Sequence, residues 1–316
     1  MAESTMVSPD SAPVAPGVSP GGTKRSPVKR VWGIMFSNGK SAVGTCLFLF
    51  FVLIAIFAPL IAPYSPHYTL FIPNLAPSSA HLFGTTAQGQ DVFSQFVWGT
   101  RTTLMVGVGA GLLATALSLL IGVTGGYQGG WVDTILNFLS NIFLVLPGLA
   151  LLILIESYVH QSTPFFNGVI IGLTGWAWGA RVFRAQTMSL AQRDFVMAAR
   201  LSGASSLRVM ITEIMPNMTS VIASNIMYAC LAAILAESGL AFLGLENVTS
   251  VSWGTMLYWA SQGDALLTGA WYWFVPPGLG IALVGLSLVL MNYAIDQLTN
   301  PRLRELPKKK RRGRHE

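Results

Sequence analysis

Long apolar stretches separated by short polar segments dominate this sequence from about residue 41 onward. An α-helix that crosses the hydrocarbon core of a membrane needs about 20 mostly apolar residues. Stretches of this kind recur along the chain, and we expect about six transmembrane helices. Their expected limits are Ser41–Ala62, Thr102–Tyr127, Trp131–Val159, Phe166–Val182, Ser220–Leu245 and Tyr272–Leu298. The pattern predicts an all-α, multi-pass integral membrane protein.

The basic residues are confined to a few segments, and this distribution predicts how the helices are oriented. All of the 19 Lys and Arg residues except Arg101 lie in the blocks 24–40, 181–208 and 302–314. With six helices these blocks fall on one side of the membrane, and positive charge marks the cytoplasmic side. We therefore expect both termini in the cytoplasm and the protein in the cell membrane (inner or plasma membrane).

Composition supports the membrane assignment and divides the chain into three parts. Apolar residues make up 52% and charged residues 10% of the sequence, whereas roughly a quarter of residues are charged in soluble domains. Residues 1–30 are rich in Pro, Ser and Gly, which predicts a disordered cytoplasmic tail. Residues 31–304 form the predicted transmembrane domain, with a cytoplasmic loop at 183–217. Residues 305–316 form a basic cytoplasmic tail, for which we expect membrane lipids rather than nucleic acid as the partner.

The sequence offers no convincing site for a nucleotide or a metal. Gly39-Lys40-Ser41 resembles the end of a P-loop, but Ile34 occupies the position where that motif requires glycine. The His and Cys residues are scattered, without the close pairs typical of zinc sites. We expect no metal and no cofactor in this chain. If ATP drives the protein, another chain must bind it.

Ionisable residues inside the apolar stretches are few, and each is a functional candidate because charge is costly in a membrane. Glu237 lies in the fifth stretch and Asp133 at the start of the third. For both residues two interpretations stay open: a polar contact that fixes helix packing, and a role in a transport pathway. Such sparse charge argues against an ion-coupled secondary transporter. No catalytic constellation is present, so we expect no catalytic residue and no enzyme.

The loop between the fourth and fifth stretches has the pattern of two short helices. Asp194 is placed to cap a first helix that continues through Ala198 and Ala199. Gly203 then supplies a turn that other residues resist. Small alanines on the first helix leave a compact knob that is able to enter a groove on a partner.

The second predicted helix of the loop starts at Ser205 or Ser206, either of which can cap it. Apolar residues then recur at helical spacing, at Leu207, Met210, Ile211 and Ile214. We expect Pro216 to end this helix before the fifth stretch begins. An amphipathic hairpin lying on the membrane surface is the alternative to a docking knob.

The order Ala198-Ala199, Gly203 and Pro216 resembles the EAA loop of binding-protein-dependent ABC importer permeases. In that family the loop forms the coupling helices that dock onto the cytoplasmic ATPase. The resemblance therefore implies an ATPase-docking loop, with Asp194, Met197, Ala198, Ala199, Gly203, Ala204, Ser205 and Pro216 as its residues. Met197 stands where the family has Glu, which removes a polar anchoring contact.

Further segments, in the same order along the chain, resemble the second permease subunit of the peptide and nickel importers. They include His81–Thr86, Gly129–Asp133, Glu237–Leu245, Ser252–Leu257, Pro277–Leu279 and Pro301–Arg304. The chain also departs from the family pattern. Phe138 and Asn141 replace an Arg and an Asp, and Val248–Val251 replaces a pair of prolines in an outward-facing loop. We expect docking or substrate delivery at that loop to differ from relatives.

The resemblance implies a type I ABC importer permease architecture and a set of partners. These are a homologous second permease subunit, one or two cytoplasmic ABC ATPase subunits that bind ATP and Mg²⁺, and an extracytoplasmic substrate-binding protein. The expected function is ATP-driven import of di- or oligopeptides. Import of nickel or glutathione by the same family stays the alternative, because the sequence does not separate these substrates.

Overall fold

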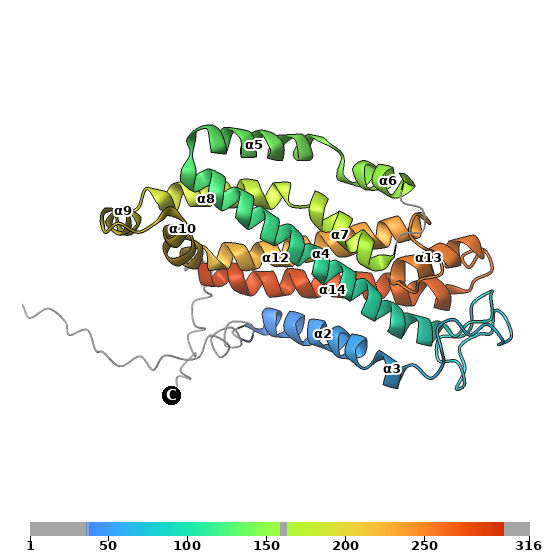
Figure 1. Cartoon of the computed structure of the whole chain (residues 1–316). Helices are drawn as coiled ribbons and strands as arrows, with labels where there is room; N and C mark the ends of the chain where they lie inside the picture. The colour runs from blue at the N-terminus through green and yellow to red at the C-terminus, as the bar shows by residue number, and fades with distance from the viewer. Residues whose placement is uncertain (1–35, 37, 159–162, 300–316) are drawn as a thin grey trace, which may run out of the picture.

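The computed structural model describes residue 36 and residues 38–158 and 163–299, without the side chains at 294 and 296–299. Within these residues the regular elements are helices, and an isolated bridge joins Thr85 to Asp91. Figure 1 shows helices that run back and forth along one long axis. The predicted tails, 1–30 and 305–316, lie outside the described residues. The fold is the all-α bundle that the apolar stretches predict.

The predicted stretches correspond to single helices in three cases and to pairs of helices in three. In order, they are α2 (Gly39–Ile56) with α3 (Ala58–Ile61), α4 (Val92–Gln128), α5 (Gly130–Val145) with α6 (Gly148–Tyr158), α7 (Pro164–Thr174) with α8 (Ala177–Ala191), α12 (Thr219–Phe242) and α14 (Trp271–Thr299). Within the described part of the chain, four helices (α2, α4, α12 and α14) are long and apolar enough to cross a membrane. The pair α5 and α6 makes a fifth span if it is counted as one.

The third stretch is not the single helix that its unbroken apolar run predicts. The axes of α5 and α6 differ in direction by 85°, and Pro147 lies between the two helices. A residue before proline is driven into extended backbone, and Leu146 has φ −70° and ψ 127°. The fourth stretch is also broken, since α7 ends at Thr174 and α8 starts at Ala177.

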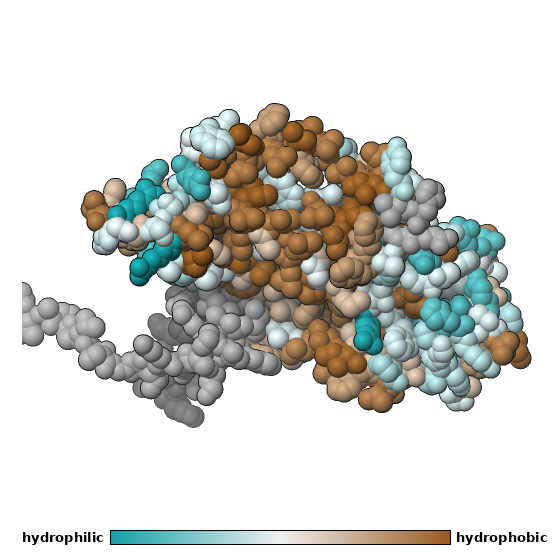
Figure 2. Space-filling model, viewed as in Figure 1, coloured by the Kyte–Doolittle hydropathy of each residue, from teal (hydrophilic) through white to brown (hydrophobic). Residues whose placement is uncertain are grey.

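Apolar side chains cover the middle of the bundle, and hydrophilic side chains gather at its two ends (Figure 2). The first turn of α2 and the last turn of α14 lie at the same end of the bundle, together with α9 (Asp194–Leu201) and α10 (Ser206–Val209) (Figure 1). The segment between α3 (Ala58–Ile61) and α4 lies at the opposite end. This arrangement agrees with a membrane that surrounds the apolar middle.

The segment between α12 and α14 contains a helix that the sequence analysis did not anticipate. This helix, α13 (Trp253–Gln262), is capped by Ser252, whose hydroxyl accepts from the backbone N–H of Thr255 while the Thr255 hydroxyl accepts from the N–H of Ser252. Trp253 at its start is fully buried. Ser252 followed three residues later by Thr255 resembles a capping box, and this spacing could have predicted the start of the helix.

Helix α4 lies at the centre of the bundle and contacts α2, α5, α7, α8, α12 and α13. Glycines let its backbone approach two of these neighbours closely. A Cβ atom on Gly111 would lie 2.5 Å from the backbone nitrogen of Cys230 in α12, and one on Gly122 would lie 2.4 Å from the carbonyl oxygen of Ala180 in α8. In lipid, where no hydrophobic effect drives helices together, such close packing is a main source of stability.

An ion pair joins α5 to α8 near the knob end of the bundle. The Arg184 guanidinium donates two hydrogen bonds to the Asp133 carboxylate, with Nη2 and Oδ2 2.6 Å apart. Both side chains are partly buried. One turn earlier on α8, exposed Arg181 donates to the Asn141 side chain. Of the two roles left open for Asp133, the structure supports the structural one.

Replacing Gly111 by alanine is expected to destabilise the bundle. The added methyl group would collide with the α12 backbone, and overpacking of this kind costs about 1–3 kcal/mol. Gly109→Ala is the matched control, because no atom lies within 4 Å of a Cβ at that position. Thermal denaturation of the purified protein in detergent should give a lower midpoint for Gly111→Ala only. Equal midpoints would show that the close approach does not stabilise the fold.

Separating Asp133 from Arg184 is expected to weaken the bundle, and exchanging the two residues is expected to restore part of the loss. Hydrogen bonds to a charged group contribute about 1.5–3 kcal/mol, so Asp133→Arg should lower the denaturation midpoint and Asp133→Arg with Arg184→Asp should recover much of it. Arg181→Ala, which removes an exposed bond to a neutral amide, should have a smaller effect. A double variant no more stable than Asp133→Arg would count against a stabilising pair.

Candidate functional site

The loop that the sequence singles out forms a helical knob, which we define as residues 194–217. It comprises α9, α10, the π-helix η1 (Met210–Ile214) and the short helix α11 (Met215–Asn217). The loop was expected to begin at residue 183, but α8 continues to Ala191 and supplies its first part as helix. The knob projects at one end of the bundle, next to the ends of α4 and α8 (Figure 1).

The first helix of the knob forms as predicted, except for its cap. Asp194 is the first helical residue and not the cap, because Arg193 precedes the helix with an extended backbone and makes no side-chain capping bond. At position 194 the carboxylate still complements the positive end of the helix dipole. Ala198 is exposed beside Met197, and Ala199 is partly buried against the knob's core.

Gly203 makes the turn between the two helices, as predicted. Its φ is +81°, which L-residues with side chains rarely adopt. The N–H of Gly203 donates to the carbonyl of Arg200 and the N–H of Ala204 to that of Ala199. These two bonds are the Schellman arrangement that ends many helices. No atom lies within 4 Å of a Cβ at Gly203, so the turn faces open space.

The second helix starts as predicted but does not end at Pro216. The Ser205 hydroxyl accepts from the N–H of Arg208 and caps the helix. Pro216 lies inside α11, and the wider π-helix η1 precedes it directly. Proline lacks an N–H and its ring collides with the carbonyl four residues earlier in a regular helix. A widened turn before Pro216 relieves this conflict, so the helical run continues to Asn217.

The inner face of the knob is anchored on the bundle by an apolar cluster. Val196, Val209 and Ile214 are fully buried and belong to one cluster with Phe183 of α8 and Val123 of α4. Burying a side chain of this size contributes about 1.5–3 kcal/mol. The knob is therefore packed onto two membrane helices and is not a hairpin held only by its ends.

The outer face of the knob exposes several apolar side chains among polar ones, and the predicted spacing did not distinguish these apolar residues from those of the inner face. Leu201 is 86% exposed, Leu207 64%, Met197 54% and Ile211 53%. Leu207 and Ile211 were grouped with Met210 and Ile214 in the predicted pattern, but the first two point outward and the last two inward. Exposed apolar residues gathered on a small element are typical of a contact surface for a partner.

A polar contact that the sequence did not predict ties the knob to the end of α4. Arg200 donates from Nε to the Tyr127 hydroxyl at 3.1 Å, and its guanidinium lies 4.5 Å from the centre of the Tyr127 ring. Directly after Tyr127, Gly129 and Gly130 both have positive φ and lead into α5. Because Arg200 and Tyr127 are far apart in sequence, no local pattern indicated this contact.

The other candidate residue, Glu237, lies far from the knob, in the last turns of α12. It is fully buried. The Ser238 hydroxyl donates to its carboxylate at 3.1 Å, and the hydroxyls of Thr103 on α4 and Ser252 at the cap of α13 lie beside it. Glu237 thus connects three helices, which supports the packing interpretation of the two that the sequence left open.

A second buried carboxylate lies next to Glu237. Glu246 follows α12, and burial, together with the nearby carboxylates of Glu237 and Glu156, raises its pKa to about 8. Burial and the neighbouring carboxylates thus favour the protonated, neutral form of Glu246. Within the described residues, no group of three or more His, Cys, Asp or Glu is placed to hold a metal ion.

Two sequence families match this chain. Residues 115–305 match the family described as the inner membrane component of binding-protein-dependent transport systems. Residues 26–77 match the N-terminal transmembrane domain of oligopeptide transport permease C. The first match contains the whole knob, and also α12, α13 and Glu237.

Curated relatives align with most of the chain. A dipeptide transport system permease protein of Bacillus subtilis is 31% identical over 86% of this chain and 85% of its own length. A di/tripeptide transport system permease protein of Pseudomonas aeruginosa is 32% identical, over 92% and 97%. An oligopeptide transport system permease protein of Mycobacterium tuberculosis is 30% identical, over 86% and 94%. The chain therefore belongs to the inner membrane components of binding-protein-dependent transport systems.

Proposed function

We propose that this chain is one permease subunit of an ATP-driven importer of di- or oligopeptides. The observation that carries the proposal is the knob, an apolar contact surface packed onto the ends of two membrane helices. The substrate class rests on the relatives, whose names specify dipeptide, di/tripeptide and oligopeptide transport. The chain itself performs no covalent chemistry in this proposal.

The knob is the site at which a cytoplasmic ATPase docks. Its exposed residues Met197, Leu201, Leu207 and Ile211 would enter a groove on the ATPase, and the small side chain of Ala198 would allow close approach. The ATPase subunits would bind ATP and Mg²⁺. A homologous second permease subunit and an extracytoplasmic substrate-binding protein complete the proposed importer, which lies in membrane lipid.

Movement of the knob would reach the membrane helices by two routes. The apolar cluster joins it to α4 and α8, and the Arg200–Tyr127 contact joins it to the glycine turn between α4 and α5. The Asp133–Arg184 pair on the far side of that turn keeps α5 and α8 together. The knob and these helices would move as one body between two states, with the ATPase biasing the equilibrium between them.

The decisive experiment compares Gly203→Arg with Gly203→Asn in the reconstituted importer. Both side chains strain the turn because φ at Gly203 is +81°, and asparagine tolerates this region better than other residues with side chains do. The arginine side chain would project into the open space where the ATPase docks. We expect Gly203→Arg to assemble normally but to lose at least ten-fold in ATP-driven peptide uptake and in ATP hydrolysis stimulated by the binding protein. Gly203→Asn should retain most of both activities.

Two results would contradict this proposal. If Gly203→Arg left uptake coupled to ATP hydrolysis unchanged, the knob would not be the docking site. If the chain carried peptides without any ATPase, it would be a secondary transporter.

A further inference from the structure

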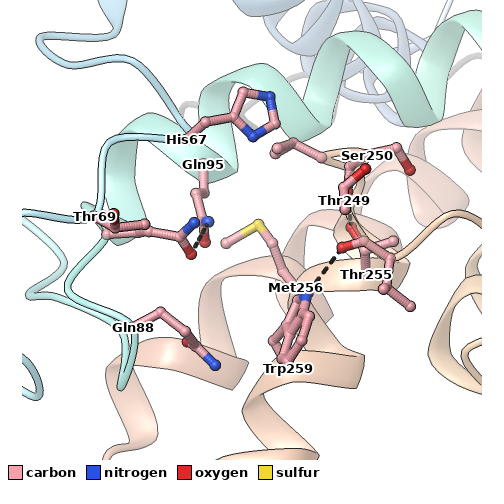
Figure 3. A pocket seen from close by; sticks show the side chains of 12 residues that line it. His67, Thr69, Gln88, Gln95, Thr249, Ser250, Thr255, Met256 and Trp259 are labelled. Atoms are coloured by element: carbon pink, nitrogen blue, oxygen red, sulfur yellow. Dashed lines mark hydrogen bonds between the residues drawn. The ribbon is translucent and has the colours of Figure 1, made fainter.

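A hollow of about 230 Å³ lies at the end of the bundle opposite the knob. One wall comes from the segment between α3 and α4 and from the first turn of α4, and the other comes from residues 248–259, which include the first turns of α13 (Figure 3). The second wall contains Val248–Val251, the segment that departs from the family pattern.

The lining of the hollow is polar on one wall and mixed on the other. The first wall carries the side-chain amides of Gln88, Gln90 and Gln95, and the second carries Met256 and Trp259. Among the lining residues there is no carboxylate, lysine or arginine, and the ionisable side chain is that of exposed His67. A charged group of a ligand would therefore lose water here without gaining a permanently charged partner, which is unfavourable. The hollow therefore favours an uncharged ligand.

The amide wall presents both a donor and an acceptor. Gln95 donates from Nε2 to Oε1 of Gln90 at 2.7 Å and to the carbonyl of Pro66 at 3.3 Å. This pairing leaves Nε2 of Gln90 as a donor and Oε1 of Gln95 as an acceptor. A backbone peptide group offers the complementary pair, one C=O and one N–H. The backbone N–H of Gln90 donates to Thr86, which holds this wall in place.

The opposite wall is a fixed apolar surface. The Trp259 indole N–H donates to the carbonyl of Val248 at 2.9 Å, which fixes the orientation of the ring. The Thr255 hydroxyl donates to the carbonyl of Ser250 at 2.9 Å and holds the loop onto α13. Because the Trp259 N–H and the Thr255 hydroxyl are already hydrogen-bonded within the protein, this wall presents the Trp259 ring and the Met256 thioether. Both are suited to contact with an apolar side chain.

We propose that this hollow binds one uncharged, apolar residue of a translocated peptide, together with its flanking peptide groups. The volume corresponds to roughly eight water molecules at about 30 Å³ each, so it holds a residue and not a folded segment. The inference rests on the proposed peptide import and adds a site on the permease itself. A peptide with Asp or Lys at the bound position should bind worse than one with Leu.

The test uses a tripeptide, Ala-X-Ala, in which X is a leucine analogue with a photoreactive diazirine. The assembled importer in detergent, without ATP and without binding protein, is irradiated with this peptide, and the adducts are mapped by mass spectrometry. We expect adducts within residues 256–259, and competition by Ala-Leu-Ala but not by Ala-Asp-Ala. The formation of adducts does not depend on transport. Peptide uptake is measured separately and tests whether the importer carries peptides.

The matched variants are Thr69→Trp and Leu70→Trp. Thr69 lines the hollow and is exposed, so a tryptophan there fills the space without disturbing the core. Its neighbour Leu70 is 78% exposed and is not part of the lining. We expect Thr69→Trp to reduce the adducts at least five-fold and Leu70→Trp to leave them unchanged.

Two outcomes would overturn the inference. The first is adduct formation at residues 256–259 that is insensitive to Thr69→Trp or equally competed by Ala-Asp-Ala. The second combines two results. The adducts no longer discriminate between Ala-Leu-Ala and Ala-Asp-Ala as competitors, and Thr69→Trp, but not Leu70→Trp, needs a several-fold higher concentration of binding protein for half-maximal stimulation of ATP hydrolysis. That result would assign the hollow to a loop of the binding protein.

Discussion

The close approach of helix backbones around α4 is the constraint on which the rest of the structure depends. In water, apolar side chains would drive these helices together, but in lipid the surrounding hydrocarbon is equally apolar. Close packing between the helices must then stabilise the bundle. Glycines such as Gly107 and Gly111 allow α12 to lie directly against α4. On another side of the same helix, Gly122 and Gly126 do this for α8. The knob and the outer hollow are both attached to this packed group of helices.

The knob combines two requirements that usually conflict. A docking element must expose apolar residues to a partner, yet a short helical loop is stable only if it buries enough apolar surface of its own. The knob meets both because its helices are apolar on two faces. Val196, Val209 and Ile214 hold it on α4 and α8, while Leu201 and Leu207 remain exposed. An exposed leucine alone means little, but several on one anchored element indicate a contact surface.

The sequence predicted those features that depend on local chemistry. The apolar stretches located the membrane helices, Gly203 marked a turn with positive φ, and Ser205 marked a cap. Two local predictions were wrong because a proline was misjudged. The apolar run 131–159 was predicted to be one helix, but Pro147 divides it into two. Pro216 was predicted to end a helix, but the π-helix before it lets the helical run continue. The contacts of Arg200 with Tyr127 and of Glu237 with Thr103 join distant segments, so no periodicity in one segment could reveal them.

Helix α4 also explains how events at one end of the molecule reach the other. Its 37 residues correspond to about 55 Å at 1.5 Å per residue. Its cap, Asp91, accepts from the backbone N–H of Ser94 near the wall of the hollow, and Tyr127 in its last turn contacts the knob. No break divides it, and Glu237 connects α4 to α12 and α13 through Thr103. A tilt of α4 imposed at the knob would therefore be transmitted to the end of the bundle that contains the hollow.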